Sequence, residues 1–473
     1  MSEIVESISI NDAIEIGKLD AHAQANLLIQ KELSKSTLCQ AAIVRIEHIN
    51  PRLNAVVYNA FDYAMEKSLQ PSSSAMAGVP YLLKASAAYP GFPMHCGSRS
   101  MLGKVAKFAY PFATKLDNAG LIPVGMSSMP EFGLLASGEP VLYGATHNPW
   151  ALDRSTAGSS SGAAAAVAAG LVPLAHASDA AGSIRMPASA CGVIGYKPSR
   201  GYNLRARVHH LIDDLLCSDS LLARSMRDTI WAANVVRPPT IPIYQSTSNT
   251  IHRPLKIAGV LRGIDGTKPD YQVERVFHQT ARLLQDSLGH ELKYISLPID
   301  EEAVSQALKV LWSYLGGELR DQCIALNPFH PIDDLLEPWT IGLALQRDTY
   351  STNDLANAFS EITKATLALE QFHQKFDVIL SPVNSTAPPQ IGHLAPTQPF
   401  ENLWEALFKY MNYTPLHNIT GTPSISLPLF MSNDNMPIGS LFSAAFGKDD
   451  ILLNLAEELE QTLPWAARWP SIF

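Results

Sequence analysis

Two turns rich in small residues carry serines whose hydroxyls could act as nucleophiles. The first reads Gly-Ser-Ser-Ser-Gly over residues 158–162, and the second reads Ala-Ala-Gly-Ser over residues 180–183. The first turn directly precedes a run of helix formers, so its backbone N–H groups are expected at a helix N-terminus, where anionic groups are stabilised. Small residues in both turns let backbone donors approach a ligand closely. These features favour a ligand site over a flexible Gly/Ser linker, which the composition alone would also permit.

A lysine that could serve as a base ends an apolar segment upstream of both turns. The segment GVPYLLKA, residues 78–85, predicts a turn and then a short strand that delivers Lys84 at its end. Burial disfavours the charged ammonium, and a neutral lysine can accept a proton from a serine, as in known Ser–Lys arrangements. Taken alone, Lys84 would more often be a surface lysine with a buried stem.

Residues 158–162 also match the Gly-X-Ser-X-Gly pattern, which would make Ser160 the nucleophile of an α/β-hydrolase. That fold requires a buried strand directly before the turn, whereas the preceding LDRSTA is polar. No HGGG-type segment is present, and none of the 14 histidines has a clear link to this turn. The pattern is therefore a weak alternative.

Composition and charge argue against several classes of protein. The 473 residues are 47% hydrophobic and 17% charged, which is typical of a globular enzyme. With a net charge of -9 and no long run of like charges, nucleic acid is not an expected partner. No metal site and no cofactor are expected, because the chain has neither HExxH spacing nor a nucleotide-binding glycine loop.

Cysteine usage and hydropathy bear on where the protein is located. Its five cysteines include no CxxC pair, which suits reduced thiols and a cytoplasmic protein. The first 17 residues carry acids where a signal peptide would carry bases. The stretch 162–177 is small and apolar but lacks the strongly apolar residues of a membrane span. We therefore expect no association with a membrane.

The elements around the serine turns alternate between helix and strand. Helical spacing predicts two helices between Asp20 and Ile49, the second with Ser36 as its N-cap and its end at Pro51. Residues 53–60 then form a predicted strand. Helical and strand patterns continue to alternate through 113–125, 157–195, 255–260 and 376–383, with no internal repeat. This order predicts an α/β fold with a central mixed β-sheet covered by helices.

One proline-, serine- and threonine-rich segment, residues 237–254, reads as a surface connection. It could divide two domains. We favour a long loop within one domain over residues 1–473, because the apolar strands on either side resemble each other and could share a sheet. The motifs that carry chemistry fall within residues 78–201 of that domain.

Together these motifs resemble the amidase-signature family. The core stands here as AGSSSGAAAAVAAG followed by AAGSIRMPASACGVIGYKP, and GVPYLLK, SMPEFG and YGATHNPW precede it in the order that the family shows. Downstream, LLARSMRDT, FDVILSPV, NITGTPSISLPL and PWAARWPSI continue the resemblance over nearly the whole chain. The resemblance implies the amidase-signature fold and a serine hydrolase that acts on carboxylic amides through an acyl-enzyme.

Roles for individual residues follow from this resemblance. Ser183 matches the nucleophile, Ser159 matches the serine that follows a cis peptide and relays a proton, and Lys84 matches the base. The backbone N–H groups of Ala180, Ala181, Gly182 and Ser183 match the oxyanion hole. Asp179 and Arg185 flank the nucleophile, and we expect them to form an ion pair that shapes the turn. Ser160 and Ser161 are expected to serve the geometry of their own turn.

The chain departs from the family pattern at several positions. Ala85 follows the lysine where an aspartate is usual, Ala157 and Ala181 replace one glycine of each double-glycine pair, and Ser128 stands where asparagine is common. No catalytic group is lost. The departure at Ala85 predicts less polar surroundings for Lys84.

Two alternatives to amide hydrolysis stay open on the sequence alone. The first is an acyltransferase of specialised-metabolite biosynthesis, in which an amine replaces water as a second substrate. The second is a subunit of an amidotransferase complex or a non-catalytic scaffold, and a homodimer is also compatible with the sequence. The expected partner is a small-molecule amide. We expect the residues that shape the substrate pocket to lie in 126–140, 300–350 and 400–415. These regions include the aromatic residues Trp312, Tyr314, Trp404 and Tyr410.

Overall fold

The computed structural model describes residues 8–207, 211–245 and 253–472. Within these ranges, five strands form one mixed sheet, with the order β1-β3-β2-β6-β8. Strand β2 lies between β3 and β6 and is parallel to both, whereas β1 and β8 at the two edges run antiparallel to their neighbours. The strands of this sheet are β1 (Val56–Asn59), β2 (Pro80–Lys84), β3 (Ile122–Ser127), β6 (Leu174–Asp179) and β8 (Ser218–Leu222).

A second sheet is built largely from the C-terminal half of the chain, with the order β10-β9-β11-β13-β12-β7. Its strands are β7 (Gly195–Lys197), β9 (Lys256–Gly259), β10 (Glu291–Tyr294), β11 (Val378–Pro382), β12 (Ser424–Met431) and β13 (Pro437–Ala444). The predicted strands at 255–260 and 376–383 correspond to β9 and β11, which pair in parallel. A separate two-stranded ribbon joins β4 (His147–Asn148) to β5 (Ala151–Ser155).

The two large sheets meet where Ile194, just before β7, forms an isolated bridge to Ala223, just after β8. The α/β class predicted from the sequence is confirmed, with the refinement that the strands form two mixed sheets joined at this bridge. The bridge supports the single domain predicted for residues 1–473, which stays a prediction. Of the segment 237–254, residues 237–245 contain no regular element, and 246–252 lie outside the described residues.

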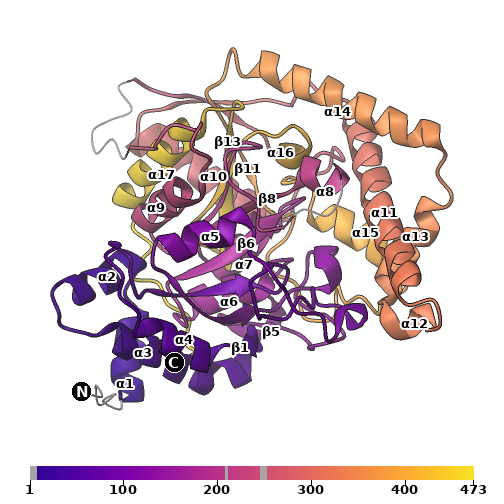
Figure 1. Ribbon diagram of the computed structural model, residues 1–473. Coiled ribbons are helices and arrows are strands. Elements are labelled where there is room, and N and C mark those ends of the chain that lie inside the picture. Colours follow the sequence, from indigo (N-terminus) through magenta and orange to yellow (C-terminus); the bar gives the residue numbers. More distant parts are fainter. Residues whose placement is uncertain (1–7, 208–210, 246–252, 473) are drawn as a thin grey trace.

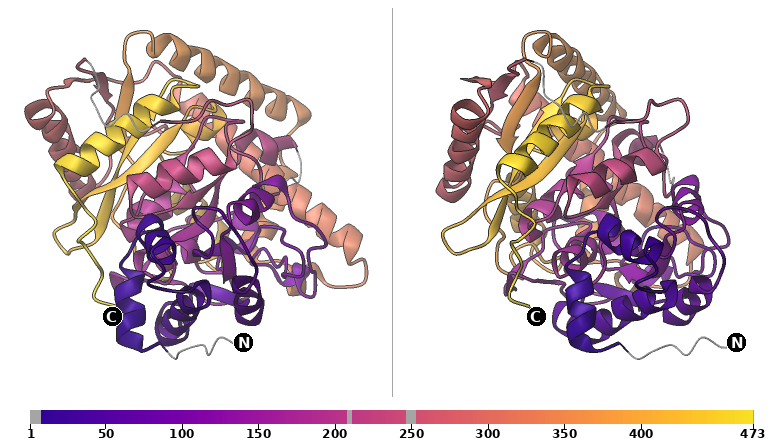
Figure 2. Two further views of the ribbon diagram at one scale, coloured as in Figure 1. Left: turned by 60° about the vertical axis from the view of Figure 1, so that its left-hand side comes forward. Right: turned by 90° about the vertical axis from the view of Figure 1, so that its left-hand side faces the viewer.

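Helices surround both sheets (Figures 1 and 2). Those of the N-terminal third are α1 (Ile10–Gly17), α2 (Ala21–Ile29), α3 (Lys35–Leu53) and α4 (Phe61–Ser68), at the lower left of Figure 1, and α5 (Pro111–Asn118), nearer its centre. The middle of the chain contributes α6 (Ser161–Ala168), α7 (Arg185–Cys191), α8 (Leu211–Leu216), α9 (Met226–Val236) and α10 (Tyr271–Arg282).

The remaining helices include an arm at the right of Figure 1, in which α11 packs against α13 and α14. These C-terminal helices are α11 (Glu301–Leu326), α12 (Ile332–Leu335), α13 (Pro338–Arg347), α14 (Thr352–Phe372), α15 (Phe400–Tyr410), α16 (Leu416–Ile419) and α17 (Asp449–Thr462). The end of the chain returns to α3, where the guanidinium of Arg52 donates to the Ile472 carbonyl at 2.7 Å. Across the described ranges we find no helix with the length and apolar character that a membrane crossing requires.

Helix α6 lies at the centre of the molecule, and all eight of its residues are buried. Its alanines and Gly162 allow this close packing: a Cβ built on Gly162 would lie 2.2 Å from the Ala55 carbonyl oxygen. Alanine also has the highest intrinsic helix propensity. A helix this small in cross-section can therefore hold the Gly-Ser-Ser-Ser turn at its N-terminus deep inside the fold.

Two boundary predictions for α3 are wrong. The N-cap is Ser34, whose side chain accepts from the Thr37 N–H, instead of Ser36. Pro51 does not end the helix, which continues to Leu53 and stops at Asn54 in the left-handed conformation. A proline this close to the end removes only one N–H donor, and the helix then needs only two more residues to finish its last turn.

Candidate active site

Lys84 is the last residue of β2, and its side chain is fully buried. Its ammonium group reaches three serine hydroxyls: Nζ lies 2.8 Å from Oγ of Ser159, 3.0 Å from Oγ of Ser160 and 3.0 Å from Oγ of Ser178. Among the described residues no carboxylate forms an ion pair with Lys84. The alternative that Lys84 is a surface lysine is thus wrong. Within the described residues, the hydrogen-bond partners of its amine are hydroxyl groups.

Burial lowers the pKa of the Lys84 ammonium to about 7, because removal from water disfavours the charged form. The positive charge of Arg207 lowers this pKa further, while Cys217, Asp219 and Asp179 act in the opposite direction. A lysine with a pKa near 7 is substantially neutral at physiological pH. Lys84 can therefore accept a proton from a hydroxyl within hydrogen-bond distance.

The first serine turn contains a cis peptide bond between Gly158 and Ser159, as the family resemblance implied. A Cβ at position 158 would lie 2.4 Å from the Ser137 carbonyl oxygen, so the turn requires glycine there. The backbone N–H of Ser160 donates to the Ser183 carbonyl at 3.2 Å, which holds the two turns side by side. The sequence separates these turns by a helix and a strand, and the fold brings them together.

Ser160 and Ser161 are engaged in the structure of their own turn. Ser160 Oγ donates to the Ser178 carbonyl at 3.2 Å and accepts the Ser178 N–H at 3.2 Å, in addition to its contact with Lys84. Ser161 Oγ donates to the Ser128 carbonyl at 3.2 Å. Both side chains are completely buried. The geometry favours the structural role predicted for them and does not favour Ser160 as a nucleophile.

The predicted ion pair between Asp179 and Arg185 is present and fully buried. Nε and Nη2 of Arg185 each donate to the Asp179 carboxylate at 2.8 Å, and the backbone N–H groups of Gly182 and Ile184 donate to the same carboxylate. Burial by itself would raise the pKa of Asp179, but Arg185 and these hydrogen bonds hold it well below its usual range. The carboxylate therefore stays charged and fixes the shape of the second turn.

One of the predicted oxyanion donors is occupied. The N–H of Gly182 donates to Asp179 at 2.6 Å and so does not point freely into the site. Within the described ranges the N–H groups of Ala180, Ala181 and Ser183 have no acceptor, and these three remain the candidate donors. Gly182 is needed for another reason, because it has φ +128° and a Cβ there would lie 2.1 Å from Thr414 Oγ1.

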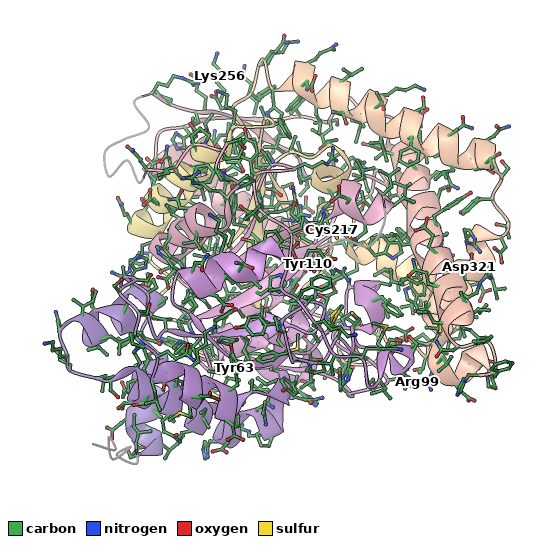
Figure 3. The ribbon with its side chains drawn as sticks, in the orientation of Figure 1. Tyr63, Arg99, Tyr110, Cys217, Lys256 and Asp321 are labelled. Atoms are coloured by element: carbon green, nitrogen blue, oxygen red, sulfur yellow. The ribbon has the colours of Figure 1, made fainter. Side chains whose placement is uncertain are left out.

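A small cavity joins the two turns. It holds about 30 Å³ of space accessible to the centres of water molecules. Ser159, Ser178, Ala180 and Ser183 form its reactive wall. Its apolar wall consists of Phe132, Leu134, Trp312, Leu315 and Leu319, and its polar end of Arg207, Asp213 and Cys217, the last of which is labelled in Figure 3.

Two of the three predicted pocket regions contribute to this cavity. Region 126–140 supplies Phe132 and Leu134, and region 300–350 supplies Trp312 through helix α11. Tyr314, Trp404 and Tyr410 instead pack in or against the hydrophobic core. Trp312 lines the cavity and Tyr314 does not, because residues two apart on a helix do not share a face.

Sequence reasoning did not find Ser178, Arg207, Asp213 or Cys217. Ser178 had a recoverable signal, since it directly precedes Asp179 at the end of a strand that leads into the second turn. The other three come from the segment between β7 and β8. Nothing in their local pattern marks them as site residues, and only the fold brings them to the cavity.

The described residues include no group of three or more His, Cys, Asp or Glu side chains placed to hold a metal ion. We expect turnover of an amide or ester to persist after incubation with EDTA and removal of free metal, because the proposed base is a lysine. The measurement is the initial rate before and after chelation, with a zinc-dependent peptidase as a positive control for the chelator. A loss of rate that zinc restores would contradict the expectation.

Comparisons with known proteins bear on the family of this chain. The family model described as Amidase matches residues 37–453. A putative amidase AmiC from Mycobacterium leprae is 33% identical over 458 residues, covering 95% of this chain and 96% of the relative. A 6-aminohexanoate-cyclic-dimer hydrolase from a Pseudomonas strain is 33% identical over 488 residues, covering 96% of each.

A solved structure of a 6-aminohexanoate cyclic dimer hydrolase complexed with substrate superposes with a TM-score of 0.88 at 30% identity, and the match covers 96% of this chain and 99% of that one. The family model and the relatives thus extend over nearly the full length, and the solved structure shares the whole fold. The chain belongs to the amidase family, whose enzymes hydrolyse carboxylic amides.

Proposed function

We propose that this protein hydrolyses a small carboxylic amide through an acyl-enzyme on Ser183. The observation that carries the proposal is the environment of Lys84: a buried amine with a pKa near 7, bonded to serine hydroxyls and to no carboxylate among the described residues. Burial and a lowered pKa do not by themselves distinguish Lys84, because Lys197 shares both and donates to the Pro198 carbonyl. What sets Lys84 apart is its contact with three hydroxyls. Here the pairing with hydroxyls suits proton transfer.

The proposed roles are those that the family resemblance implies, and the contact between Lys84 and Ser159 supports them. Lys84 accepts the proton of Ser159, Ser159 accepts that of Ser183, and the Ser183 oxygen attacks the amide carbon. The backbone N–H groups of Ala180 and Ala181 stabilise the negative charge that develops on the carbonyl oxygen. The proton then returns through Ser159 to the leaving nitrogen as the C–N bond breaks. Water releases the acid by the same steps in a second cycle and regenerates the free hydroxyl.

The cavity supports an apolar group next to the scissile amide. Phe132, Trp312 and Leu315 give this wall an apolar surface that an aliphatic or aromatic group would remove from water, whereas Arg207 and Asp213 line the polar end of the cavity. Relatives named amidase and cyclic-dimer hydrolase favour water over an amine as the acceptor of the acyl group. We therefore propose hydrolysis over amide formation and over a scaffold role.

A cytoplasmic location forms part of the proposal. All five cysteines are buried free thiols, which suits a reducing compartment. A homodimer is compatible with the sequence, and light scattering on the purified protein tests it.

The test of the proposal is to locate the acyl group. The protein is incubated with a fluorophosphonate or with an activated aryl ester, and the increase in intact mass is then mapped by peptide mass spectrometry. We expect one adduct per chain, on the peptide that contains Ser183. An adduct on Ser160 would show that the other turn supplies the nucleophile, and no adduct from either reagent would contradict serine catalysis. Heat-denatured protein is the control for non-specific acylation.

A further inference from the structure

His176 lies directly behind Lys84 and is completely buried. It belongs to β6, which pairs in parallel with β2 through Tyr81 with Leu174 and Leu82 with Ala175. That register ends two residues before Lys84. The backbone N–H of Lys84 is instead accepted by the side chain of His176, at 3.3 Å from Nδ1. At Lys84, the imidazole of His176 thus accepts the backbone N–H in place of a carbonyl of the neighbouring strand.

The other ring nitrogen of His176 is held by a buried acid. Nε2 lies 3.0 Å from Oδ1 of Asp219 on β8, and Oδ2 of Asp219 accepts from Nε of Arg205 and from the N–H of Ala206, each at 3.0 Å. Because Nδ1 accepts an N–H, the ring proton must sit on Nε2, which then donates to Asp219. The tautomer and orientation of the ring are therefore fixed from both sides.

Burial, helped by neighbouring positive charges, favours the neutral form of the His176 ring. Burial lowers its pKa, the neighbouring Lys84 and Arg207 lower it further, and Asp219 alone opposes them. The ring of Phe112 on α5 packs on the remaining side, with ring centroids 4.8 Å apart. A protonated imidazole would also present a donor to the Lys84 N–H, which would break that hydrogen bond. The arrangement is that of a fixed neutral acceptor.

We propose that His176 is a positioning residue for Lys84: held by Asp219, it accepts the Lys84 backbone N–H and so fixes the base against Ser159. This inference rests on the proposed function, since it assigns His176 a purpose only if Lys84 is the base. The physical reason is that the pairing of β2 with β6 ends at Leu82, so on this side His176 holds the Lys84 backbone, while Ser127 of β3 pairs with it on the other side. A shift of the backbone at this point would carry the amine away from three hydroxyls at once.

The His176→Asn and His176→Gln variants form a matched pair that tests the proposal. The asparagine Oδ1 occupies the place of Nδ1 and can accept the Lys84 N–H, whereas glutamine places its amide near Nε2, where it reaches Asp219 only. We expect His176→Gln to lower kcat by about 10–100-fold with KM nearly unchanged, since misplacement of a catalytic group by about 1 Å has effects of this size. His176→Asn is expected to recover most of the loss.

The pH profile separates positioning from general stability. In His176→Gln a loosened Lys84 gains access to water, so its pKa moves up toward that of an ordinary lysine, and the acid limb of kcat moves to higher pH. The concentration of active sites is determined by titration with fluorophosphonate. Rates are divided by this concentration, so that misfolded protein does not lower them. His373→Leu, at the end of α14 with its ring bonded to the Phe376 carbonyl, is a control for the loss of a histidine remote from Lys84.

Equal losses in the asparagine and glutamine variants, or an acid limb that stays in place in both, would overturn the proposal. Lys84→Met is measured in parallel. If Lys84→Met retains full amide turnover, the proposed function fails together with this inference. If Lys84→Met is inactive while both His176 variants match the wild type, only the positioning role fails. Melting temperatures of all variants show whether each is folded under the assay conditions.

Discussion

Replacing Ser183 by alanine is expected to lower kcat/KM for an amide by about 10⁴-fold or more, the scale on which loss of a serine nucleophile acts in serine hydrolases. The variant should also form no covalent adduct with a fluorophosphonate. The methylene and its packing remain, and the fold should remain too, because the turn is held by the Asp179–Arg185 pair and by backbone hydrogen bonds. Rate assays, intact mass and a melting curve measure the three expectations.

Neighbouring serines provide matched controls for this substitution. Ser161→Ala removes a hydroxyl from the same part of the molecule, one that bonds to Ser128 and not to Lys84, so labelling and turnover should stay close to the wild type. Ser160→Ala should keep the adduct on Ser183, although its contact with Lys84 predicts a slower rate. If Ser160→Ala abolished labelling while Ser183→Ala retained it, the Gly-X-Ser-X-Gly interpretation would be correct.

The catalytic candidates were predictable because each lies in a local pattern. The glycine- and alanine-rich surroundings of Ser159 and Ser183 mark turns that the backbone can form only with small residues, and a lysine at the end of an apolar strand is unusual in itself. The resemblance to the amidase-signature family, which rests on several such motifs in order, then favoured Ser183 over Ser160 as the nucleophile. A single motif would not have done so, since Gly-X-Ser-X-Gly fits the wrong serine.

The rest of the site depends on contacts between distant segments. His176 reads locally as one apolar-strand residue among others, and only the pairing of β2, β6 and β8 brings it between Lys84 and Asp219. The bond between the Gly182 N–H and Asp179 could not be predicted for a similar reason, because the direction of one N–H depends on where the Asp179 carboxylate lies. The predicted ends of α3 were also imprecise. At its start, Ser34 and Ser36 are both suitable N-caps, and at its end the helix continues two residues past Pro51.

Replacing Lys84 should distinguish amide from ester cleavage. An amine leaving group must be protonated as the C–N bond breaks, whereas an alkoxide or phenoxide leaves with less help, so the base that returns the proton matters more for the amide. We expect Lys84→Met to lower kcat/KM by about 10³–10⁴-fold for an aryl amide and by roughly tenfold less for the matching aryl ester. Methionine fills most of the space of the lysine stem, which avoids the cavity that Lys84→Ala would leave.

The same lysine predicts the pH dependence of the wild type. The reactive form is the neutral amine, and burial sets the pKa of Lys84 at about 7. Below that pH the ammonium cannot accept a proton, so the amide rate should fall about tenfold for each unit of pH, and above it the rate should reach a plateau. The residual ester activity of Lys84→Met should lack this acid limb, because the group that titrates has been removed.

An acid limb that persists unchanged in Lys84→Met would assign the titration to another group, of which His176 is the nearest candidate. The direction of its pKa argues against this, since burial lowers the pKa of His176 below its usual value. Measuring the wild type, Lys84→Met and His176→Asn with the same ester therefore separates the two. If Lys84 is the base, the limb is absent in the first variant and retained near pH 7 in the second, because asparagine cannot titrate but still holds the lysine in place.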